Sequence, residues 1–262
     1  MKRRERLNRL LELMAERHTI EVDTLQSELG VSAATIRRDL DYLDEQQMLT
    51  RTRGGAIASN VAYDLPIRYK TTRRASEKQR IAVAAAKLIA PGSAVVCNGG
   101  TTTTEFARAL AAREDLATPN STIGPLTLAT NAVNIANELA VRPNIKLVVT
   151  GGVARAQSYE LIGPLVGAVI EQLHFDVAMI GVNAMDPVAG ATGVDEKEAD
   201  VNRLMASRAK RVVIITDSSK LGLTAFANIC SIDEIDTLVT DADATPEILQ
   251  QFRDAGVETI VV

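Results

Sequence analysis

The sequence predicts an α/β protein of two domains: a small, helix-rich N-terminal domain and a larger C-terminal domain built on a mostly parallel sheet. The first 57 residues hold helix-like segments and a paired-glycine turn, whereas from residue 76 short apolar runs alternate with amphipathic helices. Such alternation is typical of a parallel sheet with helices on both faces. We therefore expect domains at residues 1–57 and 76–262, joined by a polar, basic linker at 58–75.

The composition is that of a globular protein. Hydrophobic residues make up 46% and charged residues 24% of the 262 residues, and no apolar run reaches the roughly 20 residues of a membrane helix. The basic N-terminus contains glutamates and lacks the apolar stretch of a secretory signal, so we expect a cytoplasmic protein with no membrane partner. Cys97 and Cys230 lie in or beside apolar runs and read as buried thiols. His18 and His174 have no partners at metal-ligand spacing, so we assign no metal and no cofactor.

The net charge of −4 conceals an asymmetry between the two ends of the chain. Residues 1–74 contain 14 Lys/Arg and 11 Asp/Glu, whereas the remainder contains 15 and 22. The basic N-terminal block is where a nucleic-acid footprint would lie. An offset of this size is also common on solvated surfaces, so its meaning depends on where the arginines fall.

The N-terminal domain reads as three helices followed by a hairpin. Apolar residues recur every three or four positions over 4–17, and a short strand is expected at 18–20. A short second helix closes at Gly30, which can adopt the left-handed conformation that ends helices. A third helix runs from 33 to about 45 after Ser32, a natural N-cap.

The third helix separates an apolar face from a polar one. Its apolar face is formed by Ile36, Leu40 and Leu43. The N-cap and the opposite, outward side carry small, hydroxyl and arginine side chains: Ser32, Ala34, Thr35, Arg37 and Arg38. Small residues let a helix lie deep in the major groove, and arginine can bind a phosphate or the O6/N7 edge of guanine. The arrangement predicts a helix-turn-helix that binds double-stranded operator DNA.

The hairpin at 48–57 has basic residues beside the paired glycines Gly54 and Gly55. This is typical of a wing, which would place Arg51 and Arg53 along the DNA backbone or in the minor groove. The alternative is that the arginines form only a solvated surface, with Arg37 paired to Asp41 at i+4. That alternative leaves the helices and the wing unexplained, so we favour DNA binding.

These segments resemble a known family. The stretch LGVSAATIRRDL at 29–40, followed by RGGA at 53–56, is similar to the signature of the deoxyribose-operon repressor (DeoR) family. Gln47 and Arg53 depart from it, where members usually have Gly and often have His. The resemblance implies a winged helix-turn-helix transcriptional regulator of carbohydrate metabolism genes, acting as a repressor.

The larger domain is expected to alternate strands and helices. Apolar runs predict strands at 94–97, 126–129, 145–149, 177–180, 212–215 and 238–239, with 260–262 closing the sheet. Amphipathic segments predict helices at 81–89, 103–112, 132–139, 165–173, 196–209 and 246–255. In open parallel sheets ligands bind at the carboxyl ends of the strands, so the polar residues after each strand are candidates for a binding site.

The first strand is followed by a loop suited to an anion. Gly99 and Gly100 let the backbone approach a ligand, and the hydroxyls of Thr101, Thr102 and Thr103 meet it at the start of a helix. A glycine turn with a threonine cap is the simpler explanation for the loop alone. Other strand ends add further polar or flexible candidates, namely Asn131, Gly152, Arg155, Asn183 and Lys220. Together they favour a site for a phosphorylated sugar.

The family resemblance extends over this domain as well. DeoR-family sensor domains resemble ribose-5-phosphate isomerase and have phosphorylated sugars as typical ligands, and the matching positions here include 99–103, 130–131, 151–152, 217–222 and Glu198. Asn98 stands where an Asp is often found. The resemblance implies an effector-controlled repressor. Because helix-turn-helix proteins read repeated half-sites with paired recognition helices, we expect a homodimer or homotetramer.

The alternative is a sugar-phosphate isomerase-like enzyme fused to a DNA-binding domain. Isomerisation between aldose and ketose needs a carboxylate base within reach of the substrate. Isomerases of this fold carry an acidic segment where this chain has GVNAM at 181–185, which lacks a carboxylate. We therefore expect no enzyme and assign no catalytic residue, although Asp186 and Asp195 lie nearby in the sequence.

Overall fold

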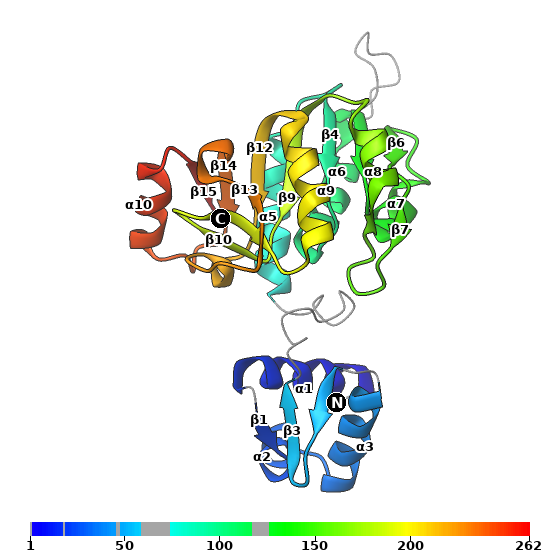
Figure 1. The fold of residues 1–262 in the computed structure, drawn as a ribbon, viewed down its shortest axis with the longest axis vertical. Helices are drawn as coiled ribbons and strands as arrows, with labels where there is room; N and C mark the ends of the chain where they lie inside the picture. Colours follow the sequence, from blue (N-terminus) through cyan, green and yellow to red (C-terminus); the bar gives the residue numbers. More distant parts are fainter. Residues whose placement is uncertain (1, 18, 46–47, 59–73, 117–125) are drawn as a thin grey trace. The chain divides into compact units, whose positions relative to one another are not determined.

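The chain folds into two compact units, Met1–Arg73 and Arg74–Val262 (Figure 1). The computed structural model describes residues 2–17, 19–45, 48–58, 74–116 and 126–262. Most of the predicted linker, residues 59–73, lies outside these described residues. Its last two residues belong to the second unit, whose first helix begins at Ala75.

In its described residues the first unit contains three helices and a three-stranded antiparallel sheet in the order β1-β3-β2. Its elements are α1 (Arg3–Arg17), β1 (Thr19–Glu21), α2 (Val22–Leu29), α3 (Ala33–Glu45), β2 (Leu49–Arg51) and β3 (Gly55–Ala58). Gly30 ends α2 with φ of +63°, a left-handed conformation that glycine adopts without steric cost. The predicted winged helix-turn-helix is confirmed.

The buried face of α3 is the one that the apolar spacing predicts. Ile36, Leu40 and Leu43 are completely buried in the core of this unit. Asp39 is buried beside them and forms an ion pair with Arg6 of α1. Because a buried carboxylate needs a partner, this pair ties α1 to α3.

Gly55 is required by the close approach of β3 to β1. A Cβ on Gly55 would lie 2.0 Å from the carbonyl oxygen of Ile20. Gly54 has open space around it. The second glycine of the predicted turn therefore serves the packing of the sheet, and a side chain there would separate the two strands.

The second unit is built on seven parallel strands in the order β15-β14-β12-β9-β4-β5-β6. These are β4 (Ala94–Cys97), β5 (Leu126–Thr130), β6 (Ile145–Val149), β9 (Phe175–Gly181), β12 (Ala209–Ile215), β14 (Thr237–Thr240) and β15 (Glu258–Val261). The helices are α5 (Ala75–Lys87), α6 (Thr101–Ala111), α7 (Val133–Leu139), α8 (Pro164–Ile170), α9 (Glu196–Ser207) and α10 (Pro246–Asp254). The predicted parallel α/β sheet is confirmed.

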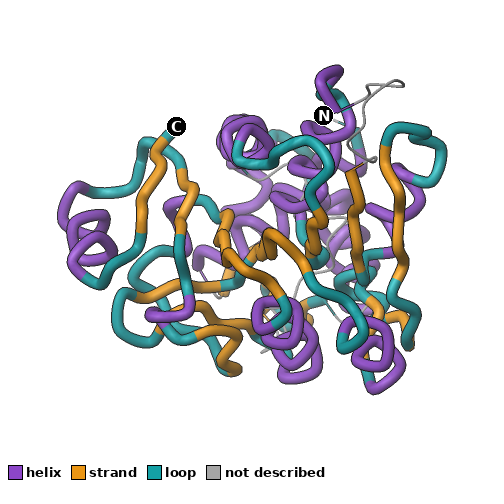
Figure 2. Tube along the Cα trace, turned by 90° about the horizontal axis from the view of Figure 1, so that it is seen from above, coloured by secondary structure: helices purple, strands orange, loops and turns teal. Residues whose placement is uncertain are grey.

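Helices cover both faces of this sheet (Figure 2). Successive strand residues point to opposite faces, so Val95 and Cys97 pack with α5, α6 and α7, whereas Val96 packs with α8 and α9. Cys97 and Cys230 are buried free thiols, as predicted. No helix in the described part of the chain has both the length and the apolar character needed to cross a membrane.

Two small antiparallel elements were not predicted. One is the hairpin of β7 (Val153–Ala154) and β8 (Leu161–Ile162). The other is a three-stranded sheet of β10 (Ala184–Asp186), β11 (Gly190–Gly193) and β13 (Ala227–Cys230), which packs beside α9. Both are inserted between the strands and helices of the main sheet.

The strand order reverses between β4 and β9. From β4 the chain moves outward through β5 to β6, then returns to β9 on the other side of β4 and continues through β12, β14 and β15. The crevice at such a reversal is where open α/β sheets bind ligands. The loops that follow β4 and β9 are therefore the expected location of a ligand-binding site.

Candidate functional site

The N-terminus of α3 presents the predicted DNA-contacting residues. Ala34, Arg37 and Arg38 are exposed, and Thr35 is half-buried. Ser32 Oγ accepts a hydrogen bond from the backbone N–H of Thr35 at 3.3 Å, so it caps the helix as expected. The exposed residues share one side of a helix whose other side is fixed in the core.

Arg51 is held by the protein itself. Its Nε donates to Asp41 Oδ1 at 2.8 Å, and its backbone N–H donates to Asp44 Oδ1 at 3.1 Å. Asp41 therefore pairs with Arg51 of the wing and not with Arg37, the partner considered from the sequence. Within the ranges that the structure describes, no carboxylate forms an ion pair with Arg37 or Arg38. Arg53 is exposed at the turn of the wing.

The loop between β4 and α6 lies at the reversal of strand order. The Asn98 side chain donates to the carbonyl oxygen of Gly181 and accepts from its N–H, both at 2.8 Å. This paired bond joins the carboxyl ends of β4 and β9. Gly100 has φ of +141°, which side chains rarely allow, and it leads directly into the first turn of α6.

The threonine hydroxyls are used differently from the expectation. Thr103 Oγ1 donates to the carbonyl oxygen of Gly100 at 3.1 Å, and Thr104 Oγ1 donates to the same oxygen at 2.6 Å. Thr102 and Thr103 are buried, and Thr101 is half-buried. The donors left for an anion include the first backbone N–H groups of α6, which have no acceptor within the helix.

Glu160 is a site residue that the sequence did not reveal. The β7–β8 hairpin folds back over the end of β5, and Glu160 bridges to Ala132 there. Its side chain lies over Gly99, where a Cβ would be 2.4 Å from Glu160 Cγ. Glu160 Oε2 accepts a hydrogen bond from Asn131 Nδ2 at 3.0 Å. A single acidic residue in a loop gave no periodic signal, and only the backfolding of the hairpin brings it to the site.

Burial changes the acidity of Glu160. Only 4% of the residue is exposed, and burial, followed by the charge of Glu198, raises the pKa of Glu160 to about 8. The Asn131 hydrogen bond and the charge of Arg155 act in the opposite direction. At neutral pH this carboxyl group is therefore mainly protonated.

Arg155 joins the hairpin to the start of α9. Its guanidinium lies 3.0 Å from Glu198 Oε1 and 3.2 Å from Asp195 Oδ2. Asp195 caps α9 by accepting hydrogen bonds from Lys197 N and Glu198 N. Two carboxylates thus neutralise the arginine that was expected to meet an anion. Arg155 and Glu198, each expected to bind the effector, contact one another.

Lys220 lies beyond β12 and contacts the loop after β9. Its Nζ donates to the carbonyl oxygen of Val182 at 2.7 Å. Burial alone would raise the pKa of Asp217, but the charge of Lys220 and a hydrogen bond from Ser219 outweigh it and lower that pKa. Asn183, in the same loop after β9, accepts from Val194 N at 3.3 Å and so fixes the approach to α9.

Gly152 serves packing. Its φ is +123°, and a Cβ there would lie 2.7 Å from Val166 Cγ2 of α8.

Six residues lie around one region of the sheet's carboxyl edge: Gly99, Gly100, Asn131, Arg155, Glu198 and the unpredicted Glu160. Lys220 joins this region through the loop after β9.

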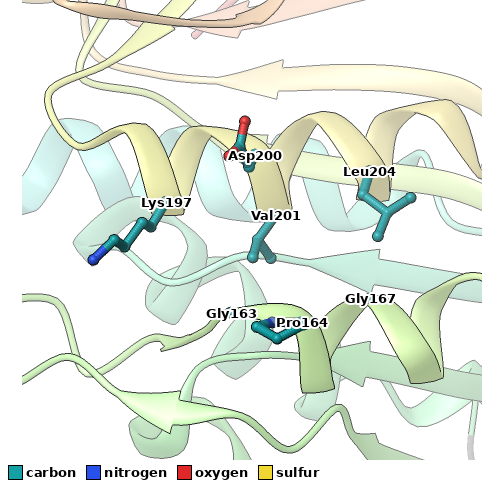
Figure 3. A pocket seen from close by; sticks show the side chains of 7 residues that line it. All are labelled: Gly163, Pro164, Gly167, Lys197, Asp200, Val201 and Leu204. Atoms are coloured by element: carbon teal, nitrogen blue, oxygen red, sulfur yellow. The ribbon is translucent and has the colours of Figure 1, made fainter.

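A shallow pocket lies elsewhere, between α8 and α9 (Figure 3). Val201 and Leu204 point from α9 toward α8, and the pocket contains none of the predicted effector residues. Lys197 and Asp200 are its only charged lining residues. It has no group of converging polar atoms, so we place the candidate site at the sheet edge.

The raised pKa of Glu160 predicts a pH-dependent stability. The folded protein retains a proton on Glu160 up to about pH 8, whereas an unfolded glutamate loses it near pH 4.3. The folded state therefore binds more protons between these values, and stability falls as pH rises through that window and levels off above it. We expect the melting temperature of the wild type, relative to Glu160→Gln, to decline from pH 5 to pH 8 by scanning calorimetry. A constant difference would contradict the protonated state of Glu160.

Comparison with known proteins identifies the family. Residues 6–61 match the DeoR-like helix-turn-helix domain, and residues 73–242 match the DeoR C terminal sensor domain. The chain belongs to the DeoR family. It is 33% identical over 257 residues to the HTH-type transcriptional regulator GlpR of Haloferax volcanii, covering 98% of this chain and 96% of that protein. It is 29% identical over 258 residues to the glycerol-3-phosphate regulon repressor of Escherichia coli, covering 98% of each.

This DeoR-family protein is a DNA-binding transcriptional regulator, and its relatives are named as regulators, not as enzymes. The predictions of a DNA-binding transcriptional regulator and of a regulator that is not an enzyme are thereby confirmed. Among solved structures, ribose 5-phosphate isomerase A of Methanocaldococcus jannaschii aligns with a TM-score of 0.40 and 19% identity, over 55% of this chain and 53% of that one. So distant a likeness carries no argument about activity.

Proposed function

We propose that this regulator represses carbohydrate genes by binding operator DNA through α3 and that a phosphorylated sugar or polyol bound at the sheet edge releases it. The proposal that α3 binds operator DNA rests on Arg37 and Arg38, which are exposed and form no ion pair among the described residues. As in other helix-turn-helix proteins, two copies would read two half-sites. A homodimer or homotetramer would supply them.

The observation that carries the effector half is the loop at the reversal of strand order. Gly99 and Gly100 keep side chains away from the first turn of α6, whose free N–H groups suit an anion. Asn131 binds Glu160 beside this loop, and Glu198 lies close enough to Glu160 for its charge to act on it. The Asn131 amide and the Glu198 carboxyl group are of the kind that bind hydroxyls. A ligand with a phosphate at one end and hydroxyl groups at the other would fit both parts of this site, as a sugar phosphate or a polyol phosphate does. A relative named as a glycerol-3-phosphate regulon repressor is consistent with this class.

The end of the linker offers a route for control. Arg74, near the end of the predicted linker and the first residue of the second unit, donates to Asp243 and lies 3.9 Å from Asp217 and 4.0 Å from Asp241. These aspartates follow β12 and β14 at the same carboxyl edge as Lys220. Arg74 also holds φ of +50°, which is unusual for a residue with a side chain. An effector that bound the two arrangements of this edge with different affinity would shift DNA binding.

A thermal-shift screen tests the effector half with matched pairs of sugars and their phosphates. A ligand at 100 times its Kd stabilises a protein by about 2.7 kcal/mol, which raises Tm by several degrees. We expect at least one phosphorylated compound to give such a shift and its unphosphorylated partner to give none. Equal shifts within every pair, or none at all, would contradict a phosphate-held effector.

A further inference from the structure

Glu160 stands where the proposed effector would place its phosphate. Its carboxyl group lies directly over Gly99, and a Cβ on that glycine would be 2.7 Å from Glu160 Oε1. Gly99 is the residue from which the chain turns into α6. An anion held by the first N–H groups of α6 would therefore be a close neighbour of this carboxyl group.

The surroundings provide little support for a negative charge on Glu160. Glu198 and Asp195, at the start of α9, disfavour ionisation, and Arg155 favours it while also being paired to those two carboxylates. The Cys97 thiol, on β4, is buried and its pKa is raised to about 12, so it stays neutral. Asn131 Nδ2 is a neutral donor to the Glu160 carboxyl group.

A buried acceptor beside Glu160 also awaits a partner. Asn131 is completely buried, and its Oδ1 has no hydrogen-bond partner within the described ranges. Buried polar atoms without partners are rare and costly. Asn131 donates through Nδ2 to Glu160 and to the carbonyl oxygen of Leu161. A ligand hydroxyl that donated to Oδ1 would satisfy the amide completely.

We propose that Glu160 is an effector-binding residue and that it acts as a neutral carboxyl group, donating a hydrogen bond to a phosphate oxygen. The inference rests on the proposed function. A carboxylate in this position would repel the phosphate, whereas a carboxylic acid supplies the donor that an anion needs. Asn131 holds the other oxygen and receives a hydroxyl of the effector. Glu160 thereby selects for a phosphorylated ligand, and binding requires its proton.

The consequence is proton-linked binding. Because the free carboxyl titrates near pH 8, the effector must bring a proton with it above that pH, and its affinity falls up to tenfold per pH unit. The second ionisation of phosphate monoesters has a pKa of about 6 and is nearly complete by pH 7.5, so these ligands contribute little pH dependence between pH 7.5 and 9.5. Glutamine at position 160 keeps a neutral donor of the same shape and removes the titration.

The test is isothermal titration of the full chain with inorganic phosphate, glycerol 3-phosphate, ribose 5-phosphate and glucose 6-phosphate at pH 7.5, 8.5 and 9.5. We expect the wild-type Kd of at least one probe to rise about tenfold in the upper unit and the Kd of Glu160→Gln to stay constant. Glu171→Gln removes an exposed glutamate that directly follows α8 and should behave like the wild type. A wild-type Kd independent of pH, or an equal rise in Glu160→Gln, overturns the inference and leaves the proposed function standing. Binding of no probe at any pH overturns both.

Proton uptake provides a second measurement that needs no variant. Wild-type protein is titrated with a binding probe at pH 8.5 in two buffers of different ionisation enthalpy. The inference requires between about half a proton and one proton taken up per ligand bound. Uptake of none would refute the role of Glu160 even if the glutamine variant failed to fold.

Discussion

Replacing Gly99 by alanine is expected to weaken effector binding by roughly tenfold to a hundredfold. The added Cβ would lie 2.4 Å from Glu160 Cγ and 2.7 Å from Glu160 Oε1, far inside contact distance. Glu160 is enclosed, so relief requires displacing either its carboxyl group or the loop, at about 1–3 kcal/mol for overpacking. Either movement disrupts the proposed phosphate-binding position. The Kd of the phosphorylated probes, by calorimetry, measures the loss.

Gly167→Ala is the matched control for that substitution. Gly167 lies in α8, and a Cβ there would be 3.7 Å from Leu204 Cδ2, an ordinary contact. Alanine also favours a helix more than glycine does. We expect effector affinity within about twofold of the wild type. If Gly99→Ala behaved like Gly167→Ala, the loop before α6 would not be the effector site.

Replacing Arg38 by alanine is expected to lower the preference for operator over random DNA by about 1–3 kcal/mol, which is roughly fivefold to 150-fold. Arg38 is exposed on α3, and the core residues Ile36 and Leu40 fix the orientation of that helix. Its guanidinium is therefore available to a base edge. Fluorescence anisotropy with both DNAs at one salt concentration gives the ratio.

Arg9→Ala removes the same charge from the exposed surface of α1 and serves as the comparison. A lost phosphate contact or a lower net charge weakens binding to all sequences alike. We expect Arg9→Ala to leave the ratio of affinities unchanged. An unchanged ratio in Arg38→Ala as well would show that Arg38 reads no base.

Periodic features of the sequence predicted most of the fold. The apolar runs give the bounds of β4 and β6 as the structure has them, and the caps Ser32 and Gly30 locate the two helices of the DNA-binding motif. These signals are local, because burial of a whole strand or of one helix face dictates residue types at fixed spacing. The small strands β7, β8, β10, β11 and β13 carry no such signal, since each has two to four residues and all but β8 contain Gly or Ala.

The candidate site was only partly visible in the sequence. The strand ends drew attention to Gly99, Asn131 and the loop after β9, which lie at the carboxyl edge of the sheet. The tertiary pairings were not predictable: Arg155 engages two carboxylates, and Arg51 takes the Asp41 that the i+4 rule assigns to Arg37. Each depends on segments that only the folded chain brings together.

The measurement that tests the central claim most directly is release of DNA by an effector. Fluorescence anisotropy follows the full chain on DNA from upstream of its own gene, at fixed moderate salt, while sugar and polyol phosphates are added. We expect saturable binding that one phosphorylated compound reverses and its unphosphorylated form does not. Specific binding that no phosphorylated compound alters would contradict the claim that the sheet edge controls α3.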